Sequence, residues 1–169
     1  VKTRLARALG EEQAAESYQR LAENNLQVLA PLQKSGLSLV VAFDPPEAKD
    51  KMRAWLSSEY IYQPQARGGL GERLSLAFET AFKKDAEKVI AVGSDTLGLE
   101  AEIVRKAYEI LNHSDLVLGP AKDGGYYLIG FSHPEPRLFQ NIPWSTSQVL
   151  HETLLRAEEV GFSYRLLEE

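Results

Sequence analysis

Near the start of the chain, hydrophobic residues recur at the spacing of one turn of a helix. Leu5 and Leu9 predict a short helix that stops at Gly10. A second helix is predicted from a further set of apolar residues at helical spacing, namely Ala14, Tyr18, Leu21 and Ala22. We expect this helix to continue toward Leu32, with a break or bend near Asn24-Asn25.

Short continuous apolar runs then predict strands that are buried on both faces. These runs cover residues 37–43, 89–92 and 115–119, and helical patterns over 47–56, 72–84 and 100–111 alternate with them. Further elements are expected as strands at 60–63 and 162–167 and as helices at 136–140 and 147–160. Residues 126–131 follow the previous strand too closely for a helical crossover, so an antiparallel strand is expected there. The pattern predicts an α/β fold, a three-layer sandwich with a mostly parallel mixed sheet.

The composition favours a single globular domain and excludes several kinds of site. The 169 residues fit one domain over residues 1–169, and the net charge of -5 does not favour a nucleic-acid binder. There is no cysteine, which excludes disulfides, thiolate zinc sites and a cysteine nucleophile. The absence of cysteine fits a cytoplasmic protein, which we expect. No apolar run is long enough to predict a membrane span. The histidines lack metal-ligand spacing and receive no catalytic role.

An acidic residue stands at the end of the clearest predicted strand. Gly93-Ser94-Asp95 follows residues 89–92, and ligands of parallel sheets bind beyond the carboxyl ends of strands. Asp95 is placed to hold Mg²⁺ or Mn²⁺, which prefer oxygen ligands, and the metal would bridge the phosphates of a nucleotide. The alternative is that Asp95, together with Thr96, caps the next helix.

A second carboxylate lies in an unusual string, Asp123-Gly124-Gly125-Tyr126. Asp-Gly is a strong signal for a hairpin turn, which is one interpretation. The other is functional, because small residues on both sides of one charge would let a substrate approach closely.

Basic and glycine-rich segments are candidates for phosphate binding. Lys2 and Arg4 flank Thr3 at a predicted helix start, a position that favours binding of an anion such as a diphosphate. The simpler interpretation is an exposed basic turn of the helix. Residues 68–73 form a glycine-rich loop that includes Gly71 and Arg73 and leads into a helix. Its backbone can approach a phosphate or a base, or it is a surface loop without a ligand.

Trp144-Ser145-Thr146 precedes the predicted helix at 147–160. Ser145 or Thr146 is a candidate N-cap. In a binding site, Trp144 would stack on a sugar or base while the two hydroxyls form hydrogen bonds with acceptor groups.

Five segments together resemble one protein family. They are K-T-R-L-A at 2–6, L-G-E-R-L at 70–74, G-S-D at 93–95, G-P-A-K-D-G-G-Y-Y-L-I-G at 119–130 and W-S-T at 144–146. In order and spacing they are similar to little-characterised bacterial and archaeal transferases with a glycosyltransferase A fold, of the type associated with radical-SAM or selenoprotein-like domains. The resemblance covers almost the whole chain.

The resemblance implies a nucleotide-diphospho-sugar transferase fold and a site for each part of the reaction. Lys2 and Arg4 would contact phosphates, with Gly71, Arg73 and Ser94 also on the nucleotide. Asp95 would bind the metal, Mg²⁺ or Mn²⁺, and Asp123 would lie near the metal or the acceptor as the catalytic carboxylate. The implied acceptor-binding residues are Gly124, Gly125, Tyr126, Trp144, Ser145 and Thr146.

The activity implied is metal-dependent transfer from a nucleotide-sugar to a small acceptor. Two alternatives are nucleotidyl transfer from a nucleoside triphosphate to a phosphorylated small molecule, similar to guanylyltransferases, and nucleotide binding without catalysis. The chain departs from the family pattern in having Leu97 where a proline is usual, and it is expected to lack the first strand and the C-terminal end of the domain. Donor, acceptor and oligomeric state cannot be inferred from these residues.

Overall fold

The computed structural model describes residues 10–168. The chain forms two compact units, the first made of Val1–Leu39 and Gly93–Ala101 and the second of Val40–Val92 and Glu102–Glu169. No helix within residues 10–168 is long and apolar enough to cross a membrane.

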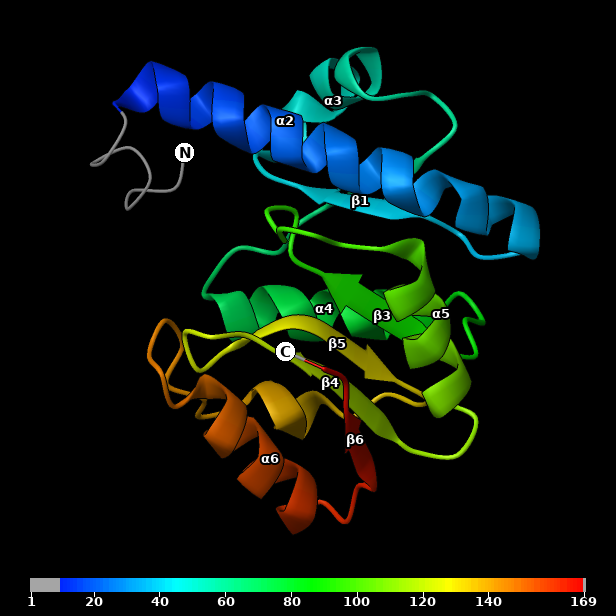
Figure 1. Ribbon diagram of the computed structural model, residues 1–169, viewed down its shortest axis with the longest axis vertical. Coiled ribbons are helices and arrows are strands. Elements are labelled where there is room, and N and C mark those ends of the chain that lie inside the picture. Colours follow the sequence, from blue (N-terminus) through cyan, green and yellow to red (C-terminus); the bar gives the residue numbers. More distant parts are fainter. Residues whose placement is uncertain (1–9, 169) are drawn as a thin grey trace. The chain divides into compact units, whose positions relative to one another are not determined.

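The first unit is built on one long helix. Helix α2 runs without interruption from Glu11–Leu29 and continues into a 3₁₀ helix, η1, at Ala30–Ser35 (Figure 1). The predicted break near Asn24-Asn25 is therefore wrong. Asn24 is exposed, whereas the side chain of Asn25 is buried and forms hydrogen bonds to another segment, which offsets its low helix propensity.

The second unit contains two sheets. In the smaller sheet, β1 (Val40–Phe43) pairs in parallel with β2 (Ile61–Pro64), and η2 (Pro46–Ala48) and α3 (Lys49–Trp55) connect them. The larger sheet has the order β3-β5-β4-β6 (Figure 1). Its strands are β3 (Val89–Val92), β4 (Leu116–Pro120), β5 (Tyr126–Phe131) and β6 (Tyr164–Leu166).

Strand directions decide where the ends of the larger sheet lie. β5 is antiparallel to both β3 and β4, and β6 is parallel to β4. Three of the four strands therefore run the same way, as expected for a mostly parallel mixed sheet with one antiparallel member. In particular, β3 and β4 end at the same edge of the sheet, with one strand between them.

Helices pack on this sheet through an apolar core. They are α4 (Leu70–Phe82), α5 (Ala101–Ile110), η3 (Pro136–Phe139) and α6 (Val149–Glu159). Phe78 of α4 contacts Phe131 of β5, with ring centroids 4.5 Å apart, and Phe139 of η3 lies 5.5 Å from both rings. The predicted helix at 136–140 is thus a 3₁₀ turn, which places two core residues, Leu138 and Phe139, against the sheet.

The middle of β5 has no room for a side chain. A Cβ at Gly130 would lie 2.9 Å from Ile90 of β3, 2.9 Å from Val117 of β4 and 3.1 Å from Leu111. Glycine at this position allows side chains from both neighbouring strands to close over β5.

Candidate functional site

The first carboxylate, Asp95, lies in a tight turn in the first unit. The backbone N–H and the hydroxyl of Thr96 both donate to the carbonyl of Gly93, at 3.1 and 2.8 Å. Asp95 is half-buried, and it follows the last residue of β3, Val92, by three positions. Helix α5 begins only at Ala101, so the alternative that Asp95 caps this helix is wrong.

Side chains from α2 hold the same turn. The amide Nδ2 of Asn25 donates to the carbonyl of Ser94 at 3.2 Å and to the carbonyl of Thr96 at 3.0 Å. Tyr18, two turns earlier, shares a 2.7 Å hydrogen bond with the hydroxyl of Ser94. Neither Tyr18 nor Asn25 was a candidate from the sequence, since a contact across about 70 positions leaves no local pattern.

The second carboxylate, Asp123, lies in a turn that belongs to the second unit. Its Oδ1 accepts a hydrogen bond from the N–H of Gly125 at 3.1 Å. Backbone hydrogen bonds close the turn: the N–H of Gly124 donates to Ala121 at 2.9 Å, and that of Ala121 to Gly125 at 3.0 Å. The interpretation of Asp123-Gly124 as a turn is therefore confirmed, and the exposed carboxylate uses one oxygen for it.

Gly124 fixes this turn against the segment that leads into α6. Its φ is +83°, and an added Cβ would lie 2.2 Å from the backbone oxygen of Ser147. Its carbonyl accepts a hydrogen bond from the N–H of Leu150 at 2.9 Å. Only glycine fits a position that combines a left-handed backbone with a backbone neighbour this close.

Trp144 joins three of the predicted segments. Its ring meets that of Tyr126 edge-on, with centroids 6.4 Å apart. A Cβ at Gly71 would lie 2.7 Å from the indole nitrogen, so the start of α4 rests against Trp144. The second unit thus brings together Gly71, Trp144 and Tyr126, which were predicted as parts of the nucleotide and acceptor sites.

Tyr126 itself points into the protein. Its hydroxyl oxygen is buried, and burial raises the pKa of the phenol well above its usual value.

The glycine-rich loop is held in place by its own charged residues. The carboxylate of Glu72 accepts a hydrogen bond from the N–H of Gly69 at 2.7 Å and closes the N-terminus of α4. The guanidinium of Arg73 donates to the carbonyl of Gly68 and to the side chain of Gln65, both at 3.0 Å, and lies 3.6 Å from the carboxylate of Asp44. Arg73 is about one-third exposed, so a fixed cation stands at the base of this loop.

The helix after Trp144 starts later than expected. α6 begins at Val149 and its N-cap is Gln148, so the prediction of Ser145 or Thr146 as N-cap is wrong. The hydroxyl of Thr146 instead donates to the carbonyl of Pro143 at 2.7 Å and accepts from the N–H of Gln148 at 3.2 Å. Ser145 has a φ of +67°, which is uncommon for a residue with a side chain.

The remaining predicted residues are distributed as follows. Ser94 and Asp95 belong to the first unit. The second unit contains the other predicted site residues that the structure describes, namely Gly71, Arg73, Asp123, Gly124, Gly125, Tyr126, Trp144, Ser145 and Thr146. Lys2 and Arg4 lie outside the described residues. Within residues 10–168 no group of three or more histidine, aspartate or glutamate side chains is arranged to hold a metal ion.

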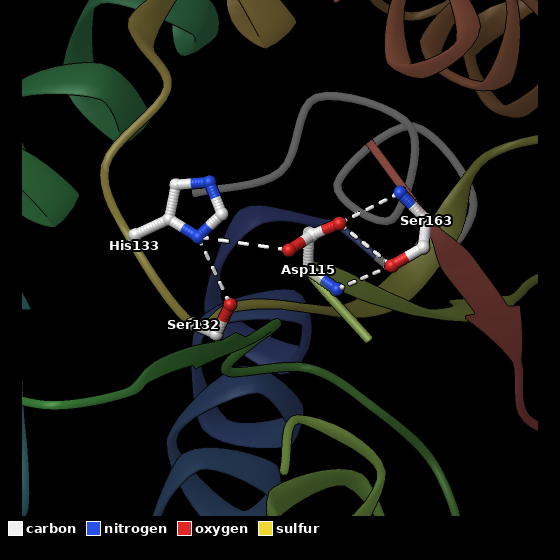
Figure 2. A network of polar contacts seen from close by, with 4 residues as sticks. All are labelled: Asp115, Ser132, His133 and Ser163. Carbon is white, nitrogen blue, oxygen red and sulfur yellow. Dashed lines mark hydrogen bonds and ion pairs between the residues drawn. The ribbon is translucent and has the colours of Figure 1, made fainter. Parts of the chain in front are cut away.

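A third carboxylate, Asp115, directly precedes β4, so it lies at the opposite end of this strand from Asp123. Figure 2 shows Asp115 with Ser132, His133 and Ser163. Its Oδ2 accepts hydrogen bonds from the hydroxyl and the N–H of Ser163, at 2.6 and 2.8 Å, and its Oδ1 lies 3.8 Å from Nδ1 of His133. Burial acts to raise the pKa of this carboxyl, but the hydrogen bonds from Ser163 and the nearby His133 outweigh burial and lower it.

This network is not a nucleophilic triad. The hydroxyl of Ser132 and the carboxylate of Asp115 approach the same ring nitrogen of His133, whereas a relay needs one partner on each nitrogen. Since Ser163 immediately precedes β6, the network ties the start of β4 to the start of β6.

The fold is that of the nucleotide-diphospho-sugar transferases. A crystal structure from Desulfovibrio desulfuricans G20, of a protein assigned to these transferases, superposes with a TM-score of 0.91 at 34% identity, covering 99% of this chain and 73% of that one. The α/β, glycosyltransferase A-like fold predicted from the sequence is therefore confirmed.

The chain belongs to the family of uncharacterized proteins conserved in bacteria that is designated DUF2064, whose model matches residues 25–146. The resemblance to a little-characterised transferase-like family is thereby confirmed. None of the curated proteins matches the chain.

Two more distant structures share the fold alone. The bifunctional IspDF from Campylobacter jejuni has a TM-score of 0.57 at 14% identity, over 90% of this chain and 42% of that one. CMP:2-keto-3-deoxy-manno-octonic acid synthetase, solved in complex with CTP, has a TM-score of 0.55 at 13% identity, over 90% of this chain and 78% of that one.

Proposed function

We propose that this protein is a metal-dependent transferase that takes a nucleotide-sugar as donor and a small molecule as acceptor. One observation supports this assignment above the others. Asp95 and Asp123 each follow the last residue of a strand by three positions, and those strands, β3 and β4, end at the same edge of a sheet in a nucleotide-diphospho-sugar transferase fold.

The pair of carboxylates suits Mg²⁺ or Mn²⁺. Both ions prefer carboxylate and phosphate oxygens, and both are commonly bound by one or two side chains together with substrate phosphates. Both strands belong to the second unit, and β5 lies between them. Two protein ligands with phosphate oxygens make a complete site, so a cluster of three acidic residues is not required.

The other predicted residues take the roles expected around such a metal. Lys2, Arg4 and Ser94 would contact the diphosphate, while Gly71 and the fixed guanidinium of Arg73 would border the nucleotide. The acceptor would lie along Gly124, Gly125 and Tyr126 and the segment Trp144, Ser145 and Thr146. Tyr126 would contribute its ring and backbone, because its hydroxyl is buried.

The reaction is a displacement at the anomeric carbon of the donor. A hydroxyl of the acceptor forms the new glycosidic bond, its proton passes to Asp123, and the bond to the diphosphate breaks, releasing a nucleoside diphosphate. When bound, the metal would offset the charge that develops on the leaving diphosphate. The residues of the protein position the reactants and exclude water, and no covalent protein intermediate is needed.

The second candidate is nucleotidyl transfer. It is favoured by the fold shared with CMP:2-keto-3-deoxy-manno-octonic acid synthetase, whose structure holds CTP, and with IspDF. In this reaction a phosphorylated acceptor attacks the α-phosphate of a nucleoside triphosphate and pyrophosphate leaves. A third candidate, nucleotide binding without turnover, is favoured by Leu97, which is 79% exposed beside Asp95. A cytoplasmic location stays a prediction.

The three candidates give different products. We would incubate the protein with nucleotide-sugars and nucleoside triphosphates, a panel of small acceptors, and Mg²⁺ or Mn²⁺. Release of nucleoside diphosphate supports glycosyl transfer, release of pyrophosphate supports nucleotidyl transfer, and metal-dependent binding without release supports a binding protein. Turnover that persists in EDTA would rule out the proposed role of the metal.

A further inference from the structure

The turn that carries Asp95 is held by a buried amide on another element. Asn25 lies in the middle of α2, and only 4% of its surface is exposed. Its Nδ2 donates to the carbonyl of Ser94, immediately before Asp95, and to the carbonyl of Thr96, immediately after it. One side chain therefore fixes the backbone on both sides of the acidic residue.

The face of α2 that carries Asn25 is suited to this contact. Ala14, Tyr18, Ala22 and Asn25 follow each other at three- or four-residue spacing, so they lie on one face of the helix. The two alanines are buried and small, and Tyr18 adds a 2.7 Å hydrogen bond to the hydroxyl of Ser94. The turn thus receives three hydrogen bonds from one helix face.

The contact of Asn25 with the turn has a cost for the helix and for one of its own polar atoms. Because Nδ2 faces two carbonyls, the orientation of the amide is fixed and Oδ1 points elsewhere. Among residues 10–168 this buried oxygen has no hydrogen-bond partner, which is unfavourable. Leucine or alanine would form a better helix, but neither could donate to the turn.

We propose that Asn25 is a positioning residue for Asp95. By holding the carbonyls of the residues on either side, its amide restrains the backbone from which the Asp95 side chain extends, and this restraint preorganises the position of Asp95 for a cation. The role of Asp95 as a ligand rests on the function proposed above, whereas the restraint on the turn does not. Partners that orient metal ligands typically change metal affinity by about 10- to 100-fold when they are removed.

The test compares the same substitution at two adjacent asparagines. Asn25→Asp keeps the size of the side chain but replaces the donating amide with a group that repels both carbonyls. Asn24→Asp introduces the same charge one residue away, at an exposed position. Two quantities are measured on each full chain: amide hydrogen exchange across residues 93–97, and Mn²⁺ affinity by electron paramagnetic resonance in the presence of a nucleoside diphosphate.

In Asn25→Asp we expect exchange in the turn to be about tenfold faster while η1 and β4 keep their protection. We also expect Mn²⁺ affinity to fall about 10- to 100-fold, with Asn24→Asp matching the native chain in both measurements. If Asn25→Asp does not fold, Asn25→Gln, which keeps the amide but displaces it by one methylene, is measured in the same way.

The positioning role is wrong if exchange in the turn is unchanged, or if it rises equally throughout the protein. Faster exchange in the turn with unchanged Mn²⁺ affinity would also overturn it, since Asp95 would then not depend on Asn25. If the native chain binds no Mn²⁺ with any nucleoside diphosphate, the proposed function fails. The exchange measurement then decides separately whether Asn25 restrains the turn.

Discussion

The two acidic turns of this protein are stabilised in different ways. Within the first unit, the turn at 93–96 depends on side chains from α2, chiefly the amide of Asn25. Within the second unit, the turn at Asp123 is closed by its own backbone, by the aspartate carboxylate and by the close fit of Gly124 against Ser147. One aspartate is thus positioned by a neighbouring helix, and the other takes part in holding its own turn.

Because of this difference, a substitution changes the shape of the turn and its charge together at one position but not at the other. At Asp123 the carboxylate serves the turn with one oxygen, so a substitution there changes both shape and charge unless the acceptor atom is kept. At Asp95 the carbonyls of the residues before and after it are held from outside the turn by the amide of Asn25, so the backbone can be altered by a substitution at Asn25 that leaves the charge of Asp95 in place. The following predictions use this contrast.

The largest effect is expected from Gly124→Ala, which attacks the turn of the second unit. The new methyl group combines an unfavourable φ of +83° with a backbone oxygen 2.2 Å away. We expect a loss of about 3–4 kcal/mol in the free energy of unfolding, measured by urea denaturation.

Gly161→Ala is the matched control for this substitution. Its φ is +76°, but nothing lies within 4 Å of the new Cβ, so only the conformational cost of about 1–2 kcal/mol is expected. Equal losses in the two variants would mean that the contact between Gly124 and Ser147 contributes nothing.

An intermediate effect, on ligand affinity, is expected from Asp95→Asn and Asp123→Asn. Each replaces a charged ligand with a neutral side chain of the same shape, and in Asp123→Asn the amide oxygen can still accept from Gly125. We expect the Mn²⁺-dependent affinity for a nucleoside diphosphate to fall about 10- to 100-fold in each, while the melting temperature of Asp123→Asn stays nearly unchanged.

The same substitution at an unrelated turn provides the reference for both. Asp85 is exposed and has a φ of 60°, which asparagine also tolerates. Asp85→Asn should bind as the native chain does. If Asp95→Asn and Asp123→Asn are indistinguishable from it, the assignment of the metal ligands is wrong.

The smallest effect concerns Asp115, the carboxylate at the other end of β4, and it depends on pH. Its pKa in the folded protein is below the usual 3.8, so its ionised form stabilises the fold above that pH. This contribution is present above pH 3.8. It is lost progressively as the pH falls from 3.8 through the lowered pKa of the folded protein. At neutral pH it amounts to about 1 kcal/mol, allowing for the partial exposure of the side chain.

Urea denaturation between pH 7 and pH 2.5 measures this contribution. The difference in unfolding free energy between the native chain and Asp115→Asn should shrink as the pH falls. Ser163→Ala, which removes a donor without changing any charge, should show the same trend. A difference that does not vary with pH would exclude the ionised carboxylate as its source.

The sequence predicted well what depends on short-range pattern. The run of valine, isoleucine and alanine at Val89–Val92 forms β3 over the predicted residues, because β-branched residues favour strands. The expectation that this strand is buried on both faces is wrong: β3 is an end strand of the four-stranded sheet, and its four residues are half-buried. The contact between Gly71 and Trp144, more than 70 positions apart, was not predicted, because it leaves no local signal in the sequence.

Where the sequence misled, long-range contacts override local preference. Asn24-Asn25 has low helix propensity and predicted a break, yet α2 continues because the turn at 93–96 supplies partners for the Asn25 amide. Ser145 and Thr146 have the chemistry of an N-cap, but Gly124 holds the chain at Ser147 and Leu150, so the helix starts at Val149. Both errors arise from contacts with residues distant in the chain.

The glycine at position 130 constrains how this protein can change during evolution. Because a methyl group there would meet Ile90, Val117 and Leu111 together, no single replacement of one neighbour makes room for it. Alanine at 130 would require the side chains of Ile90 and Val117 to shift or to become smaller, and that of Leu111 to give way slightly. We therefore expect homologous chains to keep this glycine, or to lose it only together with coordinated substitutions at positions 90, 111 and 117.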